Sequence, residues 1–341
     1  YERINLDDSF KIHHFTVNEM NLNGNSESNS EALFDSTNFT VTTESLVIKF
    51  NSKTGGILSV KDRKKNREFL NDEGNKFLFY EDRSVAYPAW DIQLYHKEMQ
   101  LDRPKIISFT FGEKNSVVAE YLIDELSQSK IIQKIEFKNS QMTFSTRVNW
   151  KDHDKLLKVS FPTKIRSRSA RLGIQFGHIE RPTHQNTIRD MAKYEVFGRW
   201  ADLSDSTGGV TICADIKSGY DVHEGEMMLS LLKAPLQTDK WCDYGWRKFT
   251  YKVDFHAEMF DAVRATNMSD ELNYPLIYCQ EKVPTNMKYK LKDYLATSDL
   301  SLLEGKFVEI KDEFNNNDHQ CVKCGVILET LKPSNDGNGF V

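Results

Sequence analysis

Residues 116–150, SVVAEYLIDELSQSKIIQKIEFKNSQMTFSTRVNW, contain three runs in which apolar and polar side chains alternate. The runs cover 116–123, 130–137 and 142–150, and each is rich in β-branched and aromatic residues. Alternation with a period of two predicts strands that bury one face of a sheet. The runs are separated only by short polar connections, which is typical of antiparallel neighbours.

Runs of the same kind occur on both sides of this stretch. They are SLVIKF (45–50), NKFLFY (75–80), KIISFTF (105–111), KLLKVSFP (155–162), LGIQFGHI (172–179), GGVTICADI (208–216), MMLSLL (227–232) and FTYKVDFH (249–256). Helical periodicity occurs only in IRDMAKY (188–194) and MSDELNYPLIY (268–278). Many strands with almost no helices between them predict an all-β fold of large antiparallel sheets packed as a sandwich.

Glycine and small polar residues mark the turns and linkers between these runs. NSKTGGILSV (51–60) predicts a hairpin, because Gly55 and Gly56 can adopt the positive φ that a tight turn needs. NLNGNSESNSEALFDSTN (21–38) is rich in Asn and Ser and has few large apolar side chains. That composition predicts a flexible linker.

Composition excludes several classes of partner. The chain has 341 residues, with 45 basic and 50 acidic side chains and a net charge of −5. It therefore lacks the basic footprint expected of a protein that binds nucleic acid. No window approaches 18 uninterrupted apolar residues, so no membrane span is predicted. Five cysteines are too few and too scattered for a disulfide framework, which favours a reducing compartment.

The stretch GHIERPTHQN (177–186) has the residue types of an active site. It brings two imidazoles, a carboxylate and a guanidinium within seven positions: His178, Glu180, Arg181 and His184. We expect it to be the end of a strand that runs into a loop, with Ile174, Phe176 and His178 on one face. A structural role as the polar edge of a strand competes with a catalytic one.

A second group of candidates points to carbohydrate. Trp90 is followed by Asp91, and an indole ring can stack on a sugar while the carboxylate binds hydroxyl groups. The alternative is that Trp90 anchors the core and Asp91 caps a turn. The sequence has no GxSxG elbow, Walker loop, Rossmann fingerprint or HExxH motif. These residues indicate a β-rich protein with a possible carbohydrate connection, and they do not specify a reaction.

Several long stretches resemble one family of carbohydrate-active enzymes. In chain order they are IKFNSKTGGILSVKDRKKNREFL (48–70), YPAWDIQLYH (87–96), FSTRVNWKDHDKLLKVSFP (144–162), FGHIERPTHQNTIRDMAKYEVFGRWADLSD (176–205), GYDVHEGEMMLSLLKAP (219–235), FTYKVDFH (249–256) and VILETLKPSNDG (326–337). Together they resemble the C-terminal β-region of glycoside hydrolase family 38 α-mannosidases of the cytosolic and vacuolar type. The resemblance covers about 290 residues in the family's order.

The resemblance implies a large antiparallel supersandwich, like that of galactose mutarotase, with smaller flanking β-modules. In this family the zinc ligands and the catalytic carboxylates belong to an N-terminal α/β barrel and its helical bundle. Nothing in this chain resembles that barrel. We therefore assign no catalytic and no metal-binding residue here, and we expect zinc to be bound outside this chain.

The resemblance also implies partners and contact residues. The expected partners are a catalytic α/β barrel domain or subunit, a mannose-containing oligosaccharide, and further copies or a larger assembly. The expected compartment is the cytoplasm or the vacuole or lysosome. Seven residues are candidates for the cleft rim or for a domain contact: Trp90, Asp91, His178, Glu180, Arg181, His184 and Asp215.

Three segments are expected along the chain. Residues 1–38 form a β-segment and the Asn/Ser-rich linker, 39–300 form the supersandwich, and 301–341 begin a further small β-module that is truncated. On this interpretation the chain supports a barrel that carries out the chemistry, and alone it is inactive.

Two other functions remain open. The first is a non-catalytic structural or assembly subunit derived from an α-mannosidase, favoured because 202–221 and 235–251 depart from the family pattern in their middle parts. The second is a sugar mutarotase, which needs a His acid and a Glu base at one anomeric carbon. His178, Glu180 and His184 are the residues that could supply them.

Overall fold

The structure is a computed structural model, and it describes residues 12–13, 16–17, 32–112, 116–187, 190, 196–237 and 239–274. Residues Ser30–Tyr274 form one compact unit. A separate unit contains the short strands β1 (Ile12–His13) and β2 (Thr16–Val17), which pair with each other in antiparallel fashion. The fold described below is that of the first unit.

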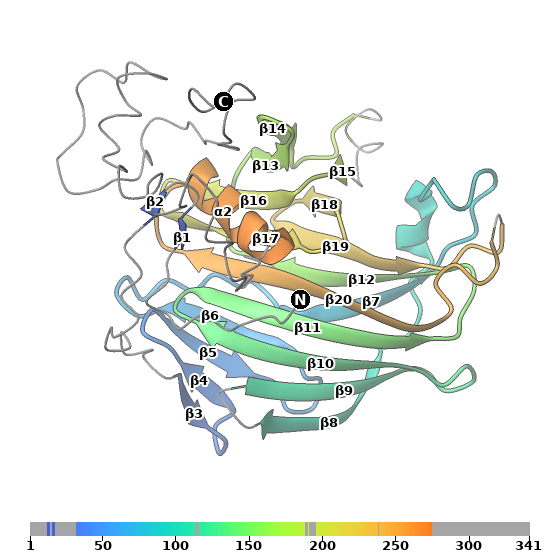
Figure 1. Ribbon diagram of the computed structural model, residues 1–341, viewed down its shortest axis with the longest axis horizontal. Coiled ribbons are helices and arrows are strands. Elements are labelled where there is room, and N and C mark those ends of the chain that lie inside the picture. The colour runs from blue at the N-terminus through green and yellow to red at the C-terminus, as the bar shows by residue number, and fades with distance from the viewer. Residues whose placement is uncertain are drawn as a thin grey trace, which may run out of the picture. The chain divides into compact units, whose positions relative to one another are not determined.

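Within the described residues, nine strands form one antiparallel sheet (Figure 1). In spatial order they are β14 (Gly177–Pro182), β13 (Ser169–Ile174), β16 (Trp200–Asp205), β17 (Gly208–Ala214), β20 (Gly245–His256), β11 (Gln141–Trp150), β10 (Ser129–Lys138), β9 (Ser116–Asp124) and β8 (Lys105–Gly112). The stretch 116–150 supplies β9, β10 and β11 as consecutive neighbours, which confirms the three predicted strands.

Two smaller antiparallel sheets form the second layer. The five-stranded sheet runs β15 (Val196–Phe197), β18 (Gly219–His223), β19 (Glu226–Lys233), β12 (Lys155–Pro162) and β7 (Lys76–Glu81). The four-stranded sheet runs β3 (Leu33–Asp35), β4 (Thr40–Thr42), β5 (Leu46–Phe50) and β6 (Ile57–Asp62). Strand β12 follows β11 in sequence but lies in the other layer, and β20 takes the place beside β11.

Aromatic side chains fill the space between the layers. Phe144 of β11 meets Phe161 of β12 with ring centroids 5.9 Å apart, and Trp150 meets Phe79 of β7 at 5.8 Å. Edge-to-face geometry of this kind adds to the gain from burying the rings. The alternating rows of apolar residues therefore form one core between two layers, and the predicted all-β antiparallel sandwich is confirmed.

One α-helix is present in the described residues, α2 (Ala262–Asn273). The sequence predicted helix over 268–278, so the observed helix begins six residues earlier. Its start is set by Asp261, whose carboxylate accepts hydrogen bonds from the backbone N–H of Val263 and Arg264. The other expected helix, 188–194, lies outside the described residues except for one position.

GHIERPTHQN is a strand that runs into a loop, as predicted, but this strand is not the continuation of 172–176. Phe176 has a φ of +64° and turns the chain back, so Gly177–Pro182 forms strand β14, paired with β13 as Leu172↔Ile179. The expected common face for Ile174, Phe176 and His178 is wrong, because alternation does not continue through a tight turn. Strand β14 is the edge of the nine-stranded sheet.

The hairpin predicted for 51–60 is present between β5 and β6, with Gly55 at a φ of +74°. The stretch predicted as a linker ends in β3, which pairs with β4, and Phe34 packs on Phe111 with centroids 5.7 Å apart. The expected domain boundary at 300 lies outside the described residues.

Candidate functional site: a charged pocket on the five-stranded sheet

Alternation along β12 and β18 sends polar side chains to the outer face of the five-stranded sheet. In β12, Val159 and its alternate neighbours belong to the sandwich core, whereas the side chain of Lys158 lies on the opposite face. In β18, Val222 belongs to the core, which places Asp221 and His223 on the outer face. All three polar side chains are nonetheless buried.

These side chains form a buried charge cluster centred on Asp221. Its Oδ1 lies 2.5 Å from Nδ1 of His223, and its Oδ2 lies 2.8 Å from Nζ of Lys97 and 3.7 Å from Nζ of Lys158. Strand β19 lies between β12 and β18, so Lys158 must extend its side chain over that strand to reach the carboxylate. Lys97 comes from the 3₁₀ helix η1 (Leu94–Glu98), which covers this face.

The cluster shifts the titration of its neighbours. Burial acts to raise the pKa of Asp221, but the hydrogen bond to His223 and the charges of Lys158 and Lys97 outweigh it and lower the pKa to about 2. Burial and the nearby Lys158 lower the pKa of His96, in η1, to about 4. Asp221 is therefore an anion and His96 is neutral at physiological pH.

A pocket of about 530 Å³ opens beside this cluster and is called the sheet-face pocket here. Its wall includes Tyr80, Lys97, Arg103, Gln185, His223 and Glu226. Because Nδ1 of His223 is committed to Asp221, Nε2 is the ring nitrogen left for a ligand. A wall of imidazole, carboxylate, ammonium and guanidinium groups suits a hydroxyl-rich or polar ligand, or a polar loop of a partner domain.

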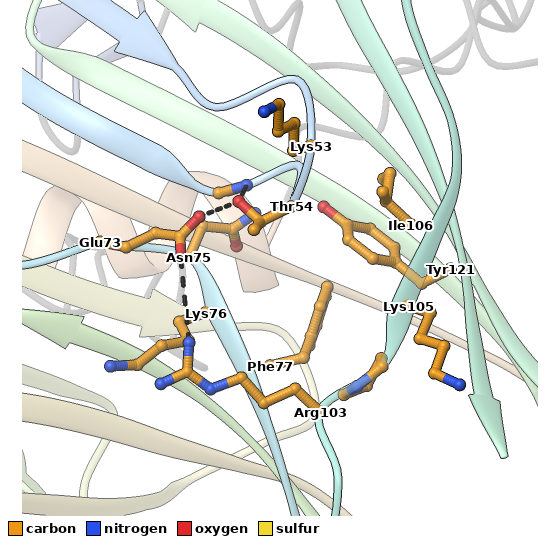
Figure 2. A pocket seen from close by; sticks show the side chains of 12 residues that line it. Lys53, Thr54, Glu73, Asn75, Lys76, Phe77, Arg103, Lys105, Ile106 and Tyr121 are labelled. Carbon is orange, nitrogen blue, oxygen red and sulfur yellow. Dashed lines mark hydrogen bonds and ion pairs between the residues drawn. The ribbon is translucent and has the colours of Figure 1, made fainter.

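A second hollow of about 350 Å³ shares Lys76 and Arg103 with the sheet-face pocket (Figure 2). Glu73 lies between Thr54, whose hydroxyl donates a hydrogen bond to it, and Arg103, 3.9 Å away. Tyr121 stands on the opposite wall and donates a hydrogen bond to the backbone carbonyl of the β5–β6 turn. The hollow therefore combines one carboxylate and several cations with an apolar wall.

A fully buried polar network lies behind this hollow. Asn75 donates a hydrogen bond to Gln133 at 2.7 Å and accepts one from the hydroxyl of Tyr251 at 2.6 Å. The amide of Gln133 also donates to Thr146 and to Tyr251. Satisfied polar networks in a core fix one arrangement of the elements they join. This one ties the segment before β7 to the centre of the nine-stranded sheet.

The seven residues predicted for a rim or contact are spread over several elements. Trp90 and Asp91 are exposed in the connection between β7 and β8, and Trp90 meets Tyr87 with centroids 6.2 Å apart. Trp90 is therefore not a core anchor. Asp215 follows β17 and accepts a hydrogen bond from the backbone N–H of Thr250.

The remaining four candidates lie on β14 and just after it, with separate partners. His178 packs against Phe260 and Trp200, and Glu180 pairs with Arg171 at 3.2 Å. His184 lies 3.6 Å from Asp190.

The side chains of His178, Glu180 and His184 are thus engaged with different neighbours rather than converging on one point. Arg181, the fourth candidate, is half-buried on β14. Gln185, three residues beyond the end of β14, is the part of GHIERPTHQN that reaches the sheet-face pocket.

Sequence reasoning missed the buried charge cluster, although two signals were present. Lys158 interrupts an otherwise apolar strand, and Asp221 and His223 are two residues apart and so share a strand face. Bringing these residues together required knowing that β12 and β18 lie in one sheet, which alternation alone does not reveal.

The described residues do not fit a zinc ion. No three His, Cys, Asp or Glu side chains converge in the part of the chain that the structure describes. Asp221 and His223 make a pair, but the lysines beside them are cations that disfavour a metal. None of the helices in the same part of the chain has the length and apolar character needed to span a lipid bilayer.

Comparison with solved structures identifies the type of fold. A solved glycosyl hydrolase family 38 protein of Enterococcus faecalis superposes with a TM-score of 0.54 and 14% identity, covering 70% of this chain and 33% of that one. The sandwich is therefore of the type found in that hydrolase.

Sequence comparison identifies the family. The glycosyl hydrolases family 38 C-terminal domain matches residues 41–240. α-Mannosidase G of Dictyostelium discoideum is 31% identical over 313 residues, covering 87% of this chain and 26% of that protein. The α-mannosidase of Saccharomyces cerevisiae is 33% identical over 267 residues, covering 72% of this chain and 24% of that protein. The chain belongs to glycoside hydrolase family 38, and it spans about a quarter of the length of these relatives.

Proposed function

We propose that this chain is the β-domain of an α-mannosidase, supporting a catalytic domain that lies outside it. The observation that carries the proposal is the match of the family's C-terminal domain to residues 41–240, combined with relatives that are α-mannosidases about four times longer than the matched part. The partner would be a catalytic α/β barrel, and the substrate a mannose-containing oligosaccharide.

The reaction is hydrolysis of terminal α-mannosides with retention. One carboxylate attacks the anomeric carbon to form a mannosyl-enzyme, and a second acts first as acid and then as base. Zinc, bound outside this chain, would orient the sugar hydroxyls. The residues of this chain would hold the catalytic domain in place and shape the rim of its cleft. The protein would be located in the cytoplasm or the vacuole, as the family resemblance implies.

Deletion of the sandwich tests this role. The complete enzyme, the enzyme lacking residues 32–274 and this chain alone would be assayed for release of an aryl alcohol from an aryl α-mannoside. We expect activity in the complete enzyme only, with a loss of at least a hundredfold in the other two. Undiminished activity after deletion, with the remaining domain shown to be folded, would rule out a supporting role.

A non-catalytic assembly subunit remains the second candidate, favoured by the divergent middle parts of 202–221 and 235–251. The two functions predict different partners for the tagged chain when it is isolated from its own cell. The α-mannosidase role predicts a polypeptide with a catalytic barrel, covalently continuous or associated. Recovery of a stable assembly, homo-oligomeric or mixed, that contains no such barrel would favour the second function.

A further inference from the structure

We propose that one end of the sandwich, named the aromatic end, is the surface that binds the catalytic domain. This inference rests on the proposed function and specifies where the partner docks. The aromatic end comprises six exposed side chains from the β7–β8 connection, from the segment between β19 and β20, and from the start of β20: Val85, Tyr87, Trp90, Leu236, Trp241 and Trp246.

The exposure of these side chains requires an explanation. The six are between 46% and 88% exposed. The chain has five tryptophans, of which Trp150 and Trp200 are buried in the compact unit while the other three all lie at this end. Large apolar clusters on a protein surface mark interaction sites, and tryptophan is enriched among the residues that dominate binding energy.

Hydrogen bonds join the segments that carry these side chains. The backbone N–H of Asp82 donates to the carbonyl of Asp154, whose own N–H donates to the carbonyl of Ala234 at 2.7 Å. The carboxylate of Asp154 accepts the N–H of Leu236, and Lys233 forms an ion pair with Asp82. The two aromatic segments therefore meet through the β11–β12 turn, and Figure 1 shows them in cyan and orange at the same end.

Contacts with neighbouring side chains orient two of these rings, those of Trp241 and Trp246. Tyr244 stacks on His153 at 5.9 Å and meets the edge of Trp241 at 5.1 Å. The guanidinium of Arg147 lies 5.0 Å from the ring of Trp246. Ordering these side chains on association therefore costs little entropy, which is the property of a preorganised interface.

The occupant is a large protein surface of the same enzyme. Matched relatives are about four times longer than the part that corresponds to this chain, so about three quarters of such a protein lies outside this region and is available to pack against it. A mixed apolar surface with an Arg and three tryptophans has the composition of a domain interface. A second copy of the chain and a mannose oligosaccharide are the competing occupants.

Hydrogen exchange in the complete enzyme tests the assignment. Backbone amides of residues 85–94 and 239–246 are expected to exchange at least tenfold more slowly in the complete enzyme than in this chain alone. This protection should not depend on protein concentration and should not require added sugar. Equal exchange in both would overturn the inference. Protection that appears only with mannose oligosaccharide, or only at high protein concentration, would overturn it in favour of a glycan or a second copy.

Substitution gives an independent readout. Trp90→Ala combined with Trp241→Ala is expected to speed thermal inactivation of the complete enzyme at least tenfold, while Phe176→Ala, a fully exposed aromatic on the β13–β14 turn, has no effect. The same double substitution in this chain alone should lower its unfolding midpoint only slightly, because both side chains are more than half exposed. Equal inactivation of the double variant and wild type would contradict the inference.

The two proposals fail in distinguishable ways. If deletion of residues 32–274 leaves α-mannosidase activity intact, the proposed function is wrong whatever the aromatic end contacts. If deletion abolishes activity but the aromatic end exchanges freely and tolerates the double substitution, the function stands and the docking surface is elsewhere.

Discussion

Lys158 is a fully buried lysine in the middle of an apolar strand, and its ammonium group lies 3.7 Å from the carboxylate of Asp221. A buried ion pair of this kind adds little net stability when complete, but removing one partner is costly. Lys97 and His223 complete the surroundings of the same carboxylate. The stability of the outer face of the five-stranded sheet therefore depends on one acidic residue.

Neutralising that residue should destabilise the fold. Asp221→Asn keeps the size of the side chain but removes the negative charge beside two lysines, and we expect a loss of about 3 kcal/mol in the free energy of unfolding. Urea unfolding of this chain measures it. Glu180→Gln is the matched control, because its ion pair with Arg171 is exposed and should contribute less than about 1 kcal/mol.

The same residue predicts how stability depends on pH. Its pKa is lowered from 3.8 to about 2 in the folded state, so the native carboxylate stays ionised where the unfolded one is already protonated. At about 1.4 kcal/mol per pKa unit this contributes about 2 kcal/mol, present above pH 3.8 and lost as the pH falls through about 2. The stability difference between wild type and Asp221→Asn should therefore narrow on acidification below about pH 4. A difference that widens there would contradict the assignment.

The residue types in the sequence indicated only part of the candidate functional site. The Trp90-Asp91 pair and the polar residues of GHIERPTHQN were recognisable in the sequence, but the contacts they make were not. Phe176 illustrates the reason, because a positive φ at a phenylalanine carries no sequence signal comparable to a glycine. One such turn changed the face on which His178 lies.

At the scale of elements, the strands were the most predictable part. Three predicted runs match observed strands to within one residue at each end. They are 116–123, 130–137 and 142–150, which correspond to β9, β10 and β11. The predicted start of helix α2 lies six residues after the observed one. Its first half, AVRATN, has weak apolar periodicity, and its start depends on the cap at Asp261.

Removing that cap should weaken the helix. Asp261→Ala deletes the acceptor for two backbone N–H groups, and we expect a loss of about 1 kcal/mol, with Asp261→Asn retaining most of the stability. The helix covers Trp200 and Cys213 through Ala265 and Met268, so a thermal melt of this chain should detect the change. Equal melting of the Ala variant and wild type would show that packing alone holds α2.

The turn between β18 and β19 is a second sensitive element. Glu224 and Gly225 both have positive φ, at 51° and 90°, as a two-residue hairpin turn requires. Gly225→Ala should cost about 1 to 3 kcal/mol, because the backbone is strained for alanine and the added Cβ would lie 3.2 Å from the carbonyl oxygen of Thr163. Gly177→Ala, with nothing within 4 Å of its Cβ and no positive φ, is the control for denaturant unfolding.

At the scale of the whole molecule, the sandwich class could be predicted but its pairing could not. Alternation shows that a strand has a buried face without showing which strands lie beside it. Strand β12 follows β11 in sequence but lies in the other layer, and β20 pairs with β11 instead. This arrangement therefore appears only in the structure. The sheet-face pocket depends on the place of β12 in the second layer, since its wall combines Pro162 at the end of β12 with residues of β7, β18 and β19.

We propose that the residues of this chain support and frame a mannosidase centre whose reacting carboxylates lie elsewhere. The decisive experiment traps the mannosyl-enzyme of the complete protein with a fluorinated mannosyl fluoride and maps the labelled peptide by mass spectrometry. We expect the labelled Asp or Glu to lie in a peptide outside residues 1–341. A label on any carboxylate within those residues would contradict it.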